Sequence, residues 1–196
     1  MLVAIEGMDG VGKTSVAKAI EKDLNFIYIK DPLKELFELD QEHLMRVLNK
    51  IFDYDDERIK AWTLALGEIY VLSQYKNKNV VLDRHTLLNY YWNGTDKSID
   101  IFKLEKDWFG VPDLTIILYA SPSIRIERMK KRDLNDPDLL DSYKLNDGYN
   151  KLEDFVKNNN FPYALVNTDN MSELEVIKKC KSLIDELIKS QINSII

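Results

Sequence analysis

The chain has 196 residues with a formal net charge of −6, and 45% of its residues are hydrophobic and 31% charged. This composition is too hydrophobic for a disordered chain, and residues 1–196 fit one domain with a single core. No uncharged run is much longer than about a dozen residues, whereas a membrane-spanning helix needs about 20. The sequence therefore predicts a soluble protein without a membrane segment, and its acidic balance argues against a general nucleic-acid binder.

Two local features bear on the compartment. The start, Met1–Glu6, carries no cationic residue before its apolar run and leads into a glycine-rich loop, unlike a secretory signal peptide. Cys180 is the only cysteine, which excludes an internal disulfide and a cysteine-based metal site. We therefore expect a cytoplasmic protein.

Short apolar runs rich in β-branched residues alternate with longer segments of helical periodicity. The runs that predict buried strands are Leu2–Ile5, Phe26–Ile29, Val80–Leu82, Leu114–Tyr119 and Tyr163–Val166. The segments that predict helices are 13–24, 41–52, 56–76, 98–108, 122–132, 139–158 and 171–190. Strands that alternate with helices indicate an α/β doubly wound parallel sheet, whose ligands bind at the carboxyl ends of the strands.

The segment from Gly7 to Thr14 matches the phosphate-loop pattern G-x-x-x-x-G-K-[ST], and it follows a predicted strand and opens a predicted helix. Glycines let successive backbone N–H groups face phosphate oxygens, and the positive end of the helix adds to the field. Lys13 would bridge the β- and γ-phosphates and Thr14 would ligate Mg²⁺. The loop residues predicted to bind the nucleotide are Gly7, Met8, Asp9, Gly10, Val11, Gly12, Lys13, Thr14 and Ser15.

The third predicted strand ends in Asp83-Arg84-His85, which separates this chain from other phosphate-loop proteins. A GTPase needs Asn-Lys-x-Asp after a strand, and no such segment is present; an ATPase motor normally ends a strand in Asp-Glu. Asp83 can hold Mg²⁺ through water, and Arg84 beside it can bind the phosphate of an acceptor.

With these residues the chain resembles the thymidylate kinase family of nucleoside monophosphate kinases, over most of its length. The loop has the family's acidic residue in its third position, Asp9, and Asp83-Arg84-His85 followed by Asn89 and Gly94 is similar to the family's Asp-Arg-Tyr/His stretch. Weaker matches, in the family's order, are Lys30-Asp31-Pro32, Pro112-Asp113-Leu114-Thr115, Arg128-Met129-Lys130-Lys131-Arg132 and Asp147-Gly148-Tyr149. The resemblance implies a P-loop NTPase-type three-layer sandwich with a five-stranded parallel sheet, a mobile lid at about 130–142 and a homodimer.

The same resemblance implies transfer of the γ-phosphoryl group of ATP, with Mg²⁺, to a deoxynucleoside monophosphate, typically dTMP to dTDP. Asp9 would bind the acceptor's 3′-hydroxyl, Arg84 its phosphate, and Asn89 would reach its base. Arg128 and Arg132 would bring positive charge to ATP from the lid. The predicted catalytic residues are Lys13, Asp83, Arg84, Arg128 and Arg132, with Arg128 also binding ATP and with Thr14 and Asp83 supporting the metal.

The sequence departs from the family's pattern around the acceptor. In the long helix before the third strand, a gapless count back from Asp83 puts Trp62 or Thr63 where the family has an arginine that reads thymine, with Arg58 a turn earlier. Leu88 and Tyr91-Trp92-Asn93 stand where the family's third motif has Ser and Ala-Tyr-Gln, which predicts a bulkier and differently polar acceptor pocket. The predicted acceptor-binding residues are Asp9, Arg58, Trp62, Arg84, Asn89, Trp92 and Tyr149.

These departures leave alternatives open. The chain could phosphorylate a deoxynucleoside or another pyrimidine monophosphate, because a site that hydrogen-bonds a base discriminates strongly between bases. It could also be a regulator that binds nucleotide without transferring phosphate, since the lid sequence after Arg132 is acidic.

Overall fold

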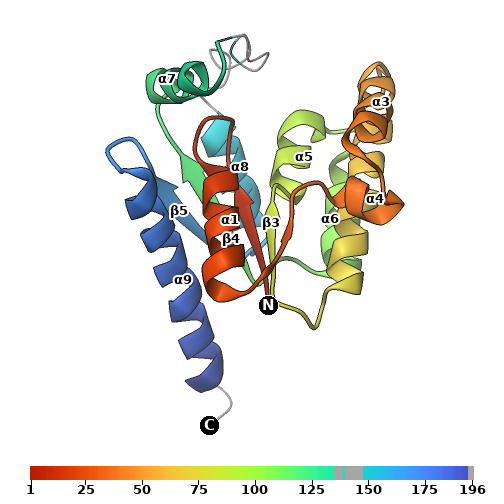
Figure 1. Ribbon diagram of the computed structural model, residues 1–196. Helices are drawn as coiled ribbons and strands as arrows, with labels where there is room; N and C mark the ends of the chain where they lie inside the picture. Colours follow the sequence, from red (N-terminus) through yellow and green to blue (C-terminus); the bar gives the residue numbers. More distant parts are fainter. Residues whose placement is uncertain (135–138, 140–147, 194–196) are drawn as a thin grey trace.

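Figure 1 shows the computed structural model of the protein, in which residues 1–134, 139 and 148–193 are described. A five-stranded sheet with the order β2-β3-β1-β4-β5 forms the centre, and every neighbouring pair is parallel. Its strands are β1 (Leu2–Glu6), β2 (Ile27–Ile29), β3 (Val80–Asp83), β4 (Leu114–Tyr119) and β5 (Tyr163–Asn167). The predicted parallel α/β fold is confirmed.

Helices cover the sheet and fill the connections between strands. In chain order they are α1 (Lys13–Leu24), α2 (Pro32–Phe37), α3 (Gln41–Phe52), α4 (Glu57–Gln74), α5 (Thr86–Asn93), α6 (Ile99–Phe109), α7 (Pro122–Arg132), α8 (Gly148–Asn158) and α9 (Glu173–Asn193). The sequence did not predict α2 and α5, because helices this short have too few turns to show a period. The predicted helix 139–158 is described as α8 from Gly148 onward, and most of the predicted lid lies outside the described residues.

Alternate residues of β1 serve opposite faces of the sheet. Val3 and Ile5 pack with α1 and α9 in one buried cluster, which also contains the free thiol of Cys180. Leu2 and Ala4 pack on the other face with residues of β3 and α4. Figure 1 shows the same layers, with α1 and α9 on one side of the sheet and α4 to α6 on the other. Among the described helices, none has the length and apolar character needed to cross a membrane.

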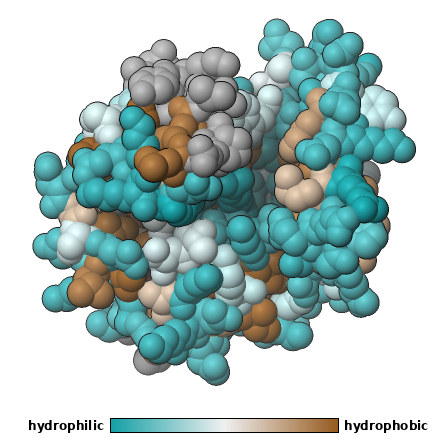
Figure 2. Space-filling model, turned by 45° about the horizontal axis from the view of Figure 1, so that its top comes forward, coloured by the Kyte–Doolittle hydropathy of each residue, from teal (hydrophilic) through white to brown (hydrophobic). Residues whose placement is uncertain are grey.

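The parallel sheet brings the ends of several strands to one edge. β1 ends at Glu6 and leads into the phosphate loop, β3 ends at Asp83, and β4 ends at Tyr119 and leads into α7. Figure 2 looks toward this part of the molecule and shows a largely hydrophilic hollow between its two sides. The fold therefore assembles the predicted chemistry at one edge of the sheet.

Candidate active site

The phosphate loop connects β1 to α1 through a backbone that side chains would disturb. At Gly7 the φ angle is +131°, and a Cβ atom would lie 2.1 Å from the carbonyl oxygen of Leu118. The loop ends at Gly12, the N-cap of α1, which makes no side-chain cap hydrogen bond. The first N–H groups of α1 are thus available to an anion, and they carry the positive end of the helix dipole.

Lys13 lies folded back over the loop that precedes it. Its side chain is 6% exposed, and its Nζ donates a hydrogen bond to the carbonyl oxygen of Met8 at 2.9 Å and lies 3.4 Å from Asp9 Oδ1. Burial lowers the pKa of Lys13, and the Asp9 carboxylate partly opposes this shift. The ammonium group is therefore held at the centre of the loop, where phosphate oxygens would lie.

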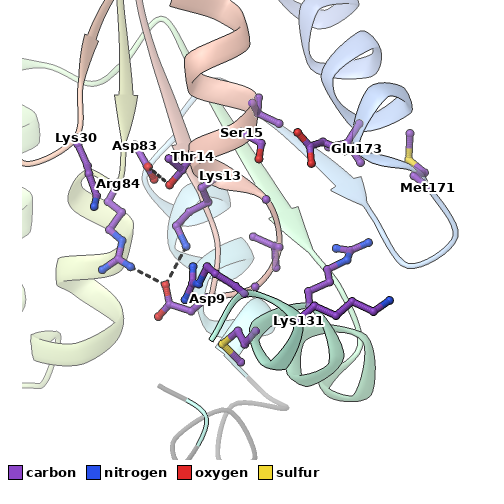
Figure 3. Close-up of a pocket in the computed structure, with 18 residues that line it drawn as sticks. Asp9, Lys13, Thr14, Ser15, Lys30, Asp83, Arg84, Lys131, Met171 and Glu173 are labelled. Carbon is purple, nitrogen blue, oxygen red and sulfur yellow. Dashed lines mark hydrogen bonds and ion pairs between the residues drawn. The ribbon is translucent and has the colours of Figure 1, made fainter. Parts of the chain in front are cut away.

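A cleft of about 820 Å³ opens over this loop, and we call it the loop cleft. The phosphate loop and the start of α1, from Asp9 to Val16, form its floor, and α7 and the start of α9 form a further part of its wall. Arg128 and Arg132 of α7 line it, as do Lys131 of α7 and Glu173 of α9, which are labelled in Figure 3. Apart from Gly7 and Met8, the predicted nucleotide-binding loop residues all line this cleft.

Thr14 and Asp83 meet beside the loop. The Thr14 hydroxyl donates to Asp83 Oδ2 at 2.5 Å, and the hydroxyl of Tyr28 on β2 donates to the same oxygen at 3.2 Å. Asp83 Oδ1 is buried and has no hydrogen-bond partner among the described residues. Hydroxyl and carboxylate oxygens are ligands that Mg²⁺ prefers, so this pair fits the predicted metal site.

Arg84 follows in a conformation that is unusual for a residue with a side chain, with φ +85°. Such backbone strain occurs where surrounding structure enforces it, often at functional sites. Its Nη2 donates to Asp9 Oδ1 at 2.6 Å, so Lys13 and Arg84 reach one carboxylate from different elements (Figure 3). Burial raises the pKa of Asp9, but the charges of Lys13 and Arg84 outweigh it and hold that pKa below its ordinary value.

A second cleft of about 620 Å³ lies between α2, α3, α4 and α5, and we call it the helical cleft. Its wall is largely apolar, with Leu44, Leu48, Phe52, Leu64, Leu88 and Trp92. Asp9, Lys30 and Arg84 line both clefts, so the two spaces adjoin there. A cleft that combines apolar side chains with charged groups where it adjoins the loop cleft suits a flat ring that carries an anionic group.

The predicted acceptor-binding residues differ in how they meet the helical cleft. Trp92 lines it with a half-exposed side chain. Asn89 also lines it, but its amide already makes internal hydrogen bonds: Nδ2 donates to Ala61 O and to Glu68 Oε2, and Oδ1 accepts from Asn93. Tyr149 lines neither cleft and packs against Tyr119, with ring centroids 5.7 Å apart.

Arg58 and Trp62 do not reach the helical cleft. Arg58 is exposed and pairs with Asp56 at 2.6 Å, and Trp62 is 43% exposed. The residues of α4 that line the cleft are Lys60, Leu64 and Glu68. Because each residue turns an α-helix by about 100°, Arg58 and Trp62 point about 160° away from Lys60. The structure thus places the two predicted residues on the opposite face of α4.

The predicted cations of α7 have individual partners. Arg128 donates from Nη1 to Thr168 Oγ1 at 2.9 Å and from Nη2 to the carbonyl oxygen of Thr168 at 2.6 Å. Lys131 pairs with Glu127 at 2.6 Å. The sequence analysis missed a third arginine of this helix, Arg125, which is fully buried and donates from Nε to the carbonyl oxygen of Asp9 at 2.8 Å. No local signal in the sequence distinguishes it from the other basic residues of this helix, which are exposed or half-buried.

Buried carboxyl groups lie beneath the site, and sequence reasoning missed them as well. Glu6 accepts hydrogen bonds from the backbone N–H groups of His85 and Leu87, and burial raises its pKa to about 8. Glu68 and Glu105 interact with each other on the side of the helical cleft, and burial raises both pKa values, that of Glu105 to about 7. Glu6 and Glu68 stand in otherwise apolar stretches, which is a signal in the sequence, whereas Glu105 has charged neighbours and carries no such signal.

Comparison with known proteins agrees with this geometry. A family model described as an AAA domain matches residues 3–146. A thymidylate kinase of Buchnera aphidicola is 31% identical over 164 residues, which cover 73% of this chain and 74% of that protein. A probable thymidylate kinase of Saccharolobus solfataricus is 28% identical over 186 residues, covering 89% and 93%.

Solved structures share the fold at lower identity. The deoxyadenosine kinase of M. mycoides with bound dATP matches 94% of this chain and 100% of that chain with a TM-score of 0.63 and 20% identity. The YorR protein of Bacillus subtilis matches with a TM-score of 0.61 and 17% identity, over 94% and 96% of the two chains. Together, the loop, the strand-end Asp-Arg pair and these relatives show that the chain belongs to the AAA-domain family of the matched model and to the thymidylate kinase family of nucleoside monophosphate kinases.

Proposed function

We propose that this protein transfers the γ-phosphoryl group of ATP to a deoxynucleoside monophosphate, with dTMP as acceptor and dTDP and ADP as products. The observation that carries the proposal is the junction of the two clefts at Asp9, Lys30 and Arg84. Two separate substrates can meet there with their phosphates adjacent. The thymidylate kinases of Buchnera and Saccharolobus support dTMP as the acceptor.

The residues of the loop cleft would hold ATP. Backbone N–H groups of the loop and Lys13 bind its phosphates, and Arg128 and Arg132 add positive charge from α7. Thr14 and Asp83 would hold Mg²⁺, which would supply positive charge to the phosphate oxygens during the transfer.

The helical cleft would hold the acceptor. Arg84 binds its phosphate, Asp9 accepts a hydrogen bond from its 3′-hydroxyl, and the base lies against the apolar wall that includes Leu88 and Trp92. An oxygen of the acceptor phosphate attacks the γ-phosphorus, the bond to the β–γ bridging oxygen breaks, and the electron pair leaves with ADP. Because this transition state is loose, positioning and positive charge suffice and no protein nucleophile is needed.

The finer structural predictions also belong to this proposal. We propose one domain over residues 1–196 with a lid at about 130–142, and a homodimer, which light scattering would test. A cytoplasmic location fits an enzyme whose donor is ATP.

A second candidate is phosphorylation of a deoxynucleoside or of another pyrimidine monophosphate. It is favoured by the helical cleft, where Asn89 is engaged internally and Arg58 and Trp62 lie on the far face of α4. The deoxyadenosine kinase of M. mycoides shares the fold and supports this candidate.

The test is ADP formation from Mg²⁺-ATP with dTMP, dUMP, dCMP, UMP, AMP, GMP, thymidine and deoxycytidine. We expect dTMP to be preferred, and Lys13→Ala to reduce turnover roughly 10³-fold without unfolding the protein, because Lys13 stabilises charge on the phosphates. Preference for thymidine or deoxycytidine would replace the proposal with the second candidate. ATP binding without transfer to any acceptor would favour a regulator.

A further inference from the structure

The side chain of Arg125 lies behind the phosphate loop rather than in either cleft. It is 0% exposed, and its Nε donates to the carbonyl oxygen of Asp9 at 2.8 Å. The backbone of α7 is pressed against the loop at the same place, since a Cβ atom on Gly10 would lie 2.8 Å from the carbonyl oxygen of Arg125. A side chain at Gly10, where φ is +83°, would push helix and loop apart.

The guanidinium group of Arg125 has two further nitrogens, Nη1 and Nη2. Both Nη1 and Nη2 are buried, and neither has a hydrogen-bond partner among the residues that the structure describes. A buried cation without partners is costly, so proteins that keep one usually pair it with an anion. Arg128, one turn further along α7, offers the contrast because both of its terminal nitrogens bond to Thr168.

The position of Arg125 indicates which anion would neutralise its positive charge. Its Nε holds Asp9, the residue that lines both clefts and whose carboxylate already meets Lys13 and Arg84. Lys13 and Arg84 contact the carboxylate of Asp9 and Arg125 contacts its backbone carbonyl, so three cations converge on one acidic residue where donor and acceptor phosphates would meet. Because water is largely excluded from the surroundings of Arg125, its positive charge attracts phosphates over several ångströms without direct contact.

We propose that Arg125 is a positioning residue of phosphoryl transfer. From behind the loop it fixes the peptide of Asp9 and supplies a buried positive charge that nucleotide phosphates neutralise when they occupy the clefts. The inference rests on the proposed kinase function. To the cations that line the two clefts it adds one, Arg125, that lines neither of them.

The experiment compares Arg125→Met with Arg128→Met and with Arg46→Met, an exposed arginine of α3 that controls for the loss of one positive charge. Melting temperatures are measured without ligand, with Mg²⁺-ATP alone, and with Mg²⁺-ADP and dTMP together. Turnover is measured with Mg²⁺-ATP and the best acceptor of the panel.

For Arg125→Met we expect a melting temperature without ligand at or above that of the wild type, because an uncompensated buried charge has been removed. We expect the stabilisation by Mg²⁺-ATP to fall and kcat to drop roughly 10²-fold, since a preorganised positive charge at the reacting phosphates is lost. Arg128→Met should melt earlier without ligand, because it loses the bonds to Thr168. Arg46→Met should match the wild type in all measurements.

A role in packing alone predicts the reverse for Arg125→Met: a lower melting temperature without ligand, with wild-type stabilisation by Mg²⁺-ATP and wild-type kcat. That result would overturn the inference. If Arg125→Met does not fold, Arg125→Gln, which keeps a donor for the Asp9 carbonyl, replaces it in the same comparison; failure of both to fold would assign Arg125 to structure and count against the proposal. Arg125→Lys should recover much of the Mg²⁺-ATP stabilisation because it restores the charge.

The two proposals fail separately. Wild-type protein that transfers phosphate to no acceptor would end the kinase proposal, while stabilisation by Mg²⁺-ATP alone would still test Arg125. An active wild type with an Arg125→Met variant of equal kcat would end only the inference.

Discussion

The loop cleft and the helical cleft adjoin at Asp9, yet they are built in different ways. The floor of the loop cleft is one contiguous stretch, from Asp9 to Val16, whose backbone is set by a strand, a tight turn and a helix. The helical cleft collects residues from α2 to α5, and each side chain reaches it only if its helix has the right rotation. A site that binds its ligand through backbone groups keeps its function when surrounding side chains are substituted. A site that binds its ligand through side chains on helix faces can change its specificity after few substitutions.

The buried charges differ as well. Beneath the loop cleft lie the cations Lys13 and Arg125, and beside the helical cleft lie the acids Glu68 and Glu105. The first arrangement attracts phosphates. In the second, burial raises the pKa of both carboxyl groups, that of Glu105 to about 7.

Substitution of Arg84 is the strongest test of whether the helical cleft binds the acceptor and the loop cleft binds ATP. For Arg84→Ala we expect the KM for dTMP to rise roughly 10²-fold, because a charge-assisted contact to the acceptor phosphate is lost. The Kd for Mg²⁺-ATP should change little, since the loop amides and Lys13 remain. Steady-state kinetics with each substrate varied in turn, and ATP binding by calorimetry, measure the two effects.

The control for Arg84→Ala is Arg84→Gly, which also removes the side chain but accepts the positive φ angle of this position. Both variants should weaken binding of the acceptor equally. The free energy of unfolding of Arg84→Gly should exceed that of Arg84→Ala by about 1 kcal/mol. Equal weakening of the binding of ATP and of dTMP would contradict the assignment of Arg84 to the acceptor phosphate.

Glu105→Gln should make the stability of the protein less dependent on pH. Burial raises the pKa of Glu105 from 4.5 to about 7, so the folded protein keeps a proton that the unfolded chain has released. Its contribution to the free energy of unfolding is therefore full below the unfolded pKa and is lost as pH rises through about 7. At pH near 8 the variant should be more stable than the wild type by an amount on the order of 3 kcal/mol, and near pH 4 the two should be equal.

Urea unfolding at several pH values measures this difference. The matched control is Glu42→Gln, an exposed glutamate on α3, whose stability should follow that of the wild type across the range. A wild-type pH slope in Glu105→Gln would show that the buried pair does not hold the extra proton.

The sequence predicted the sheet and the loop cleft well for a physical reason. Buried parallel strands are continuous apolar runs, and the phosphate loop requires glycine and lysine at fixed spacing, so both leave local patterns. The short helices α2 and α5 leave none. Asp83 and Arg84 could be predicted because they follow a strand directly, and the structure brings them to the loop.

The helical cleft was harder, as Arg58 and Trp62 show. They were chosen by a count along the chain back from Asp83, and in a helix an error of two residues rotates a side chain by about 200°. Arg125 was missed for another reason: it lies in a basic segment whose other members are exposed or half-buried, and nothing local distinguishes the one that turns inward.

The smallest predicted effect concerns the two faces of α4. Lys60 lines the helical cleft with Leu64 and Glu68, and it makes no ion pair with a carboxylate in the part of the chain that the structure describes. Its ammonium can therefore bind an oxygen of the acceptor, and we expect Lys60→Met, which keeps the aliphatic stem, to raise the KM for dTMP about five-fold with little change in kcat. Arg58→Ala, on the far face, should leave KM within about two-fold of the wild-type value, because an exposed ion pair contributes little. If instead Arg58→Ala raised the KM for dTMP and Lys60→Met did not, the base would contact the face of α4 that carries Arg58. The helix would then have to rotate when the acceptor binds.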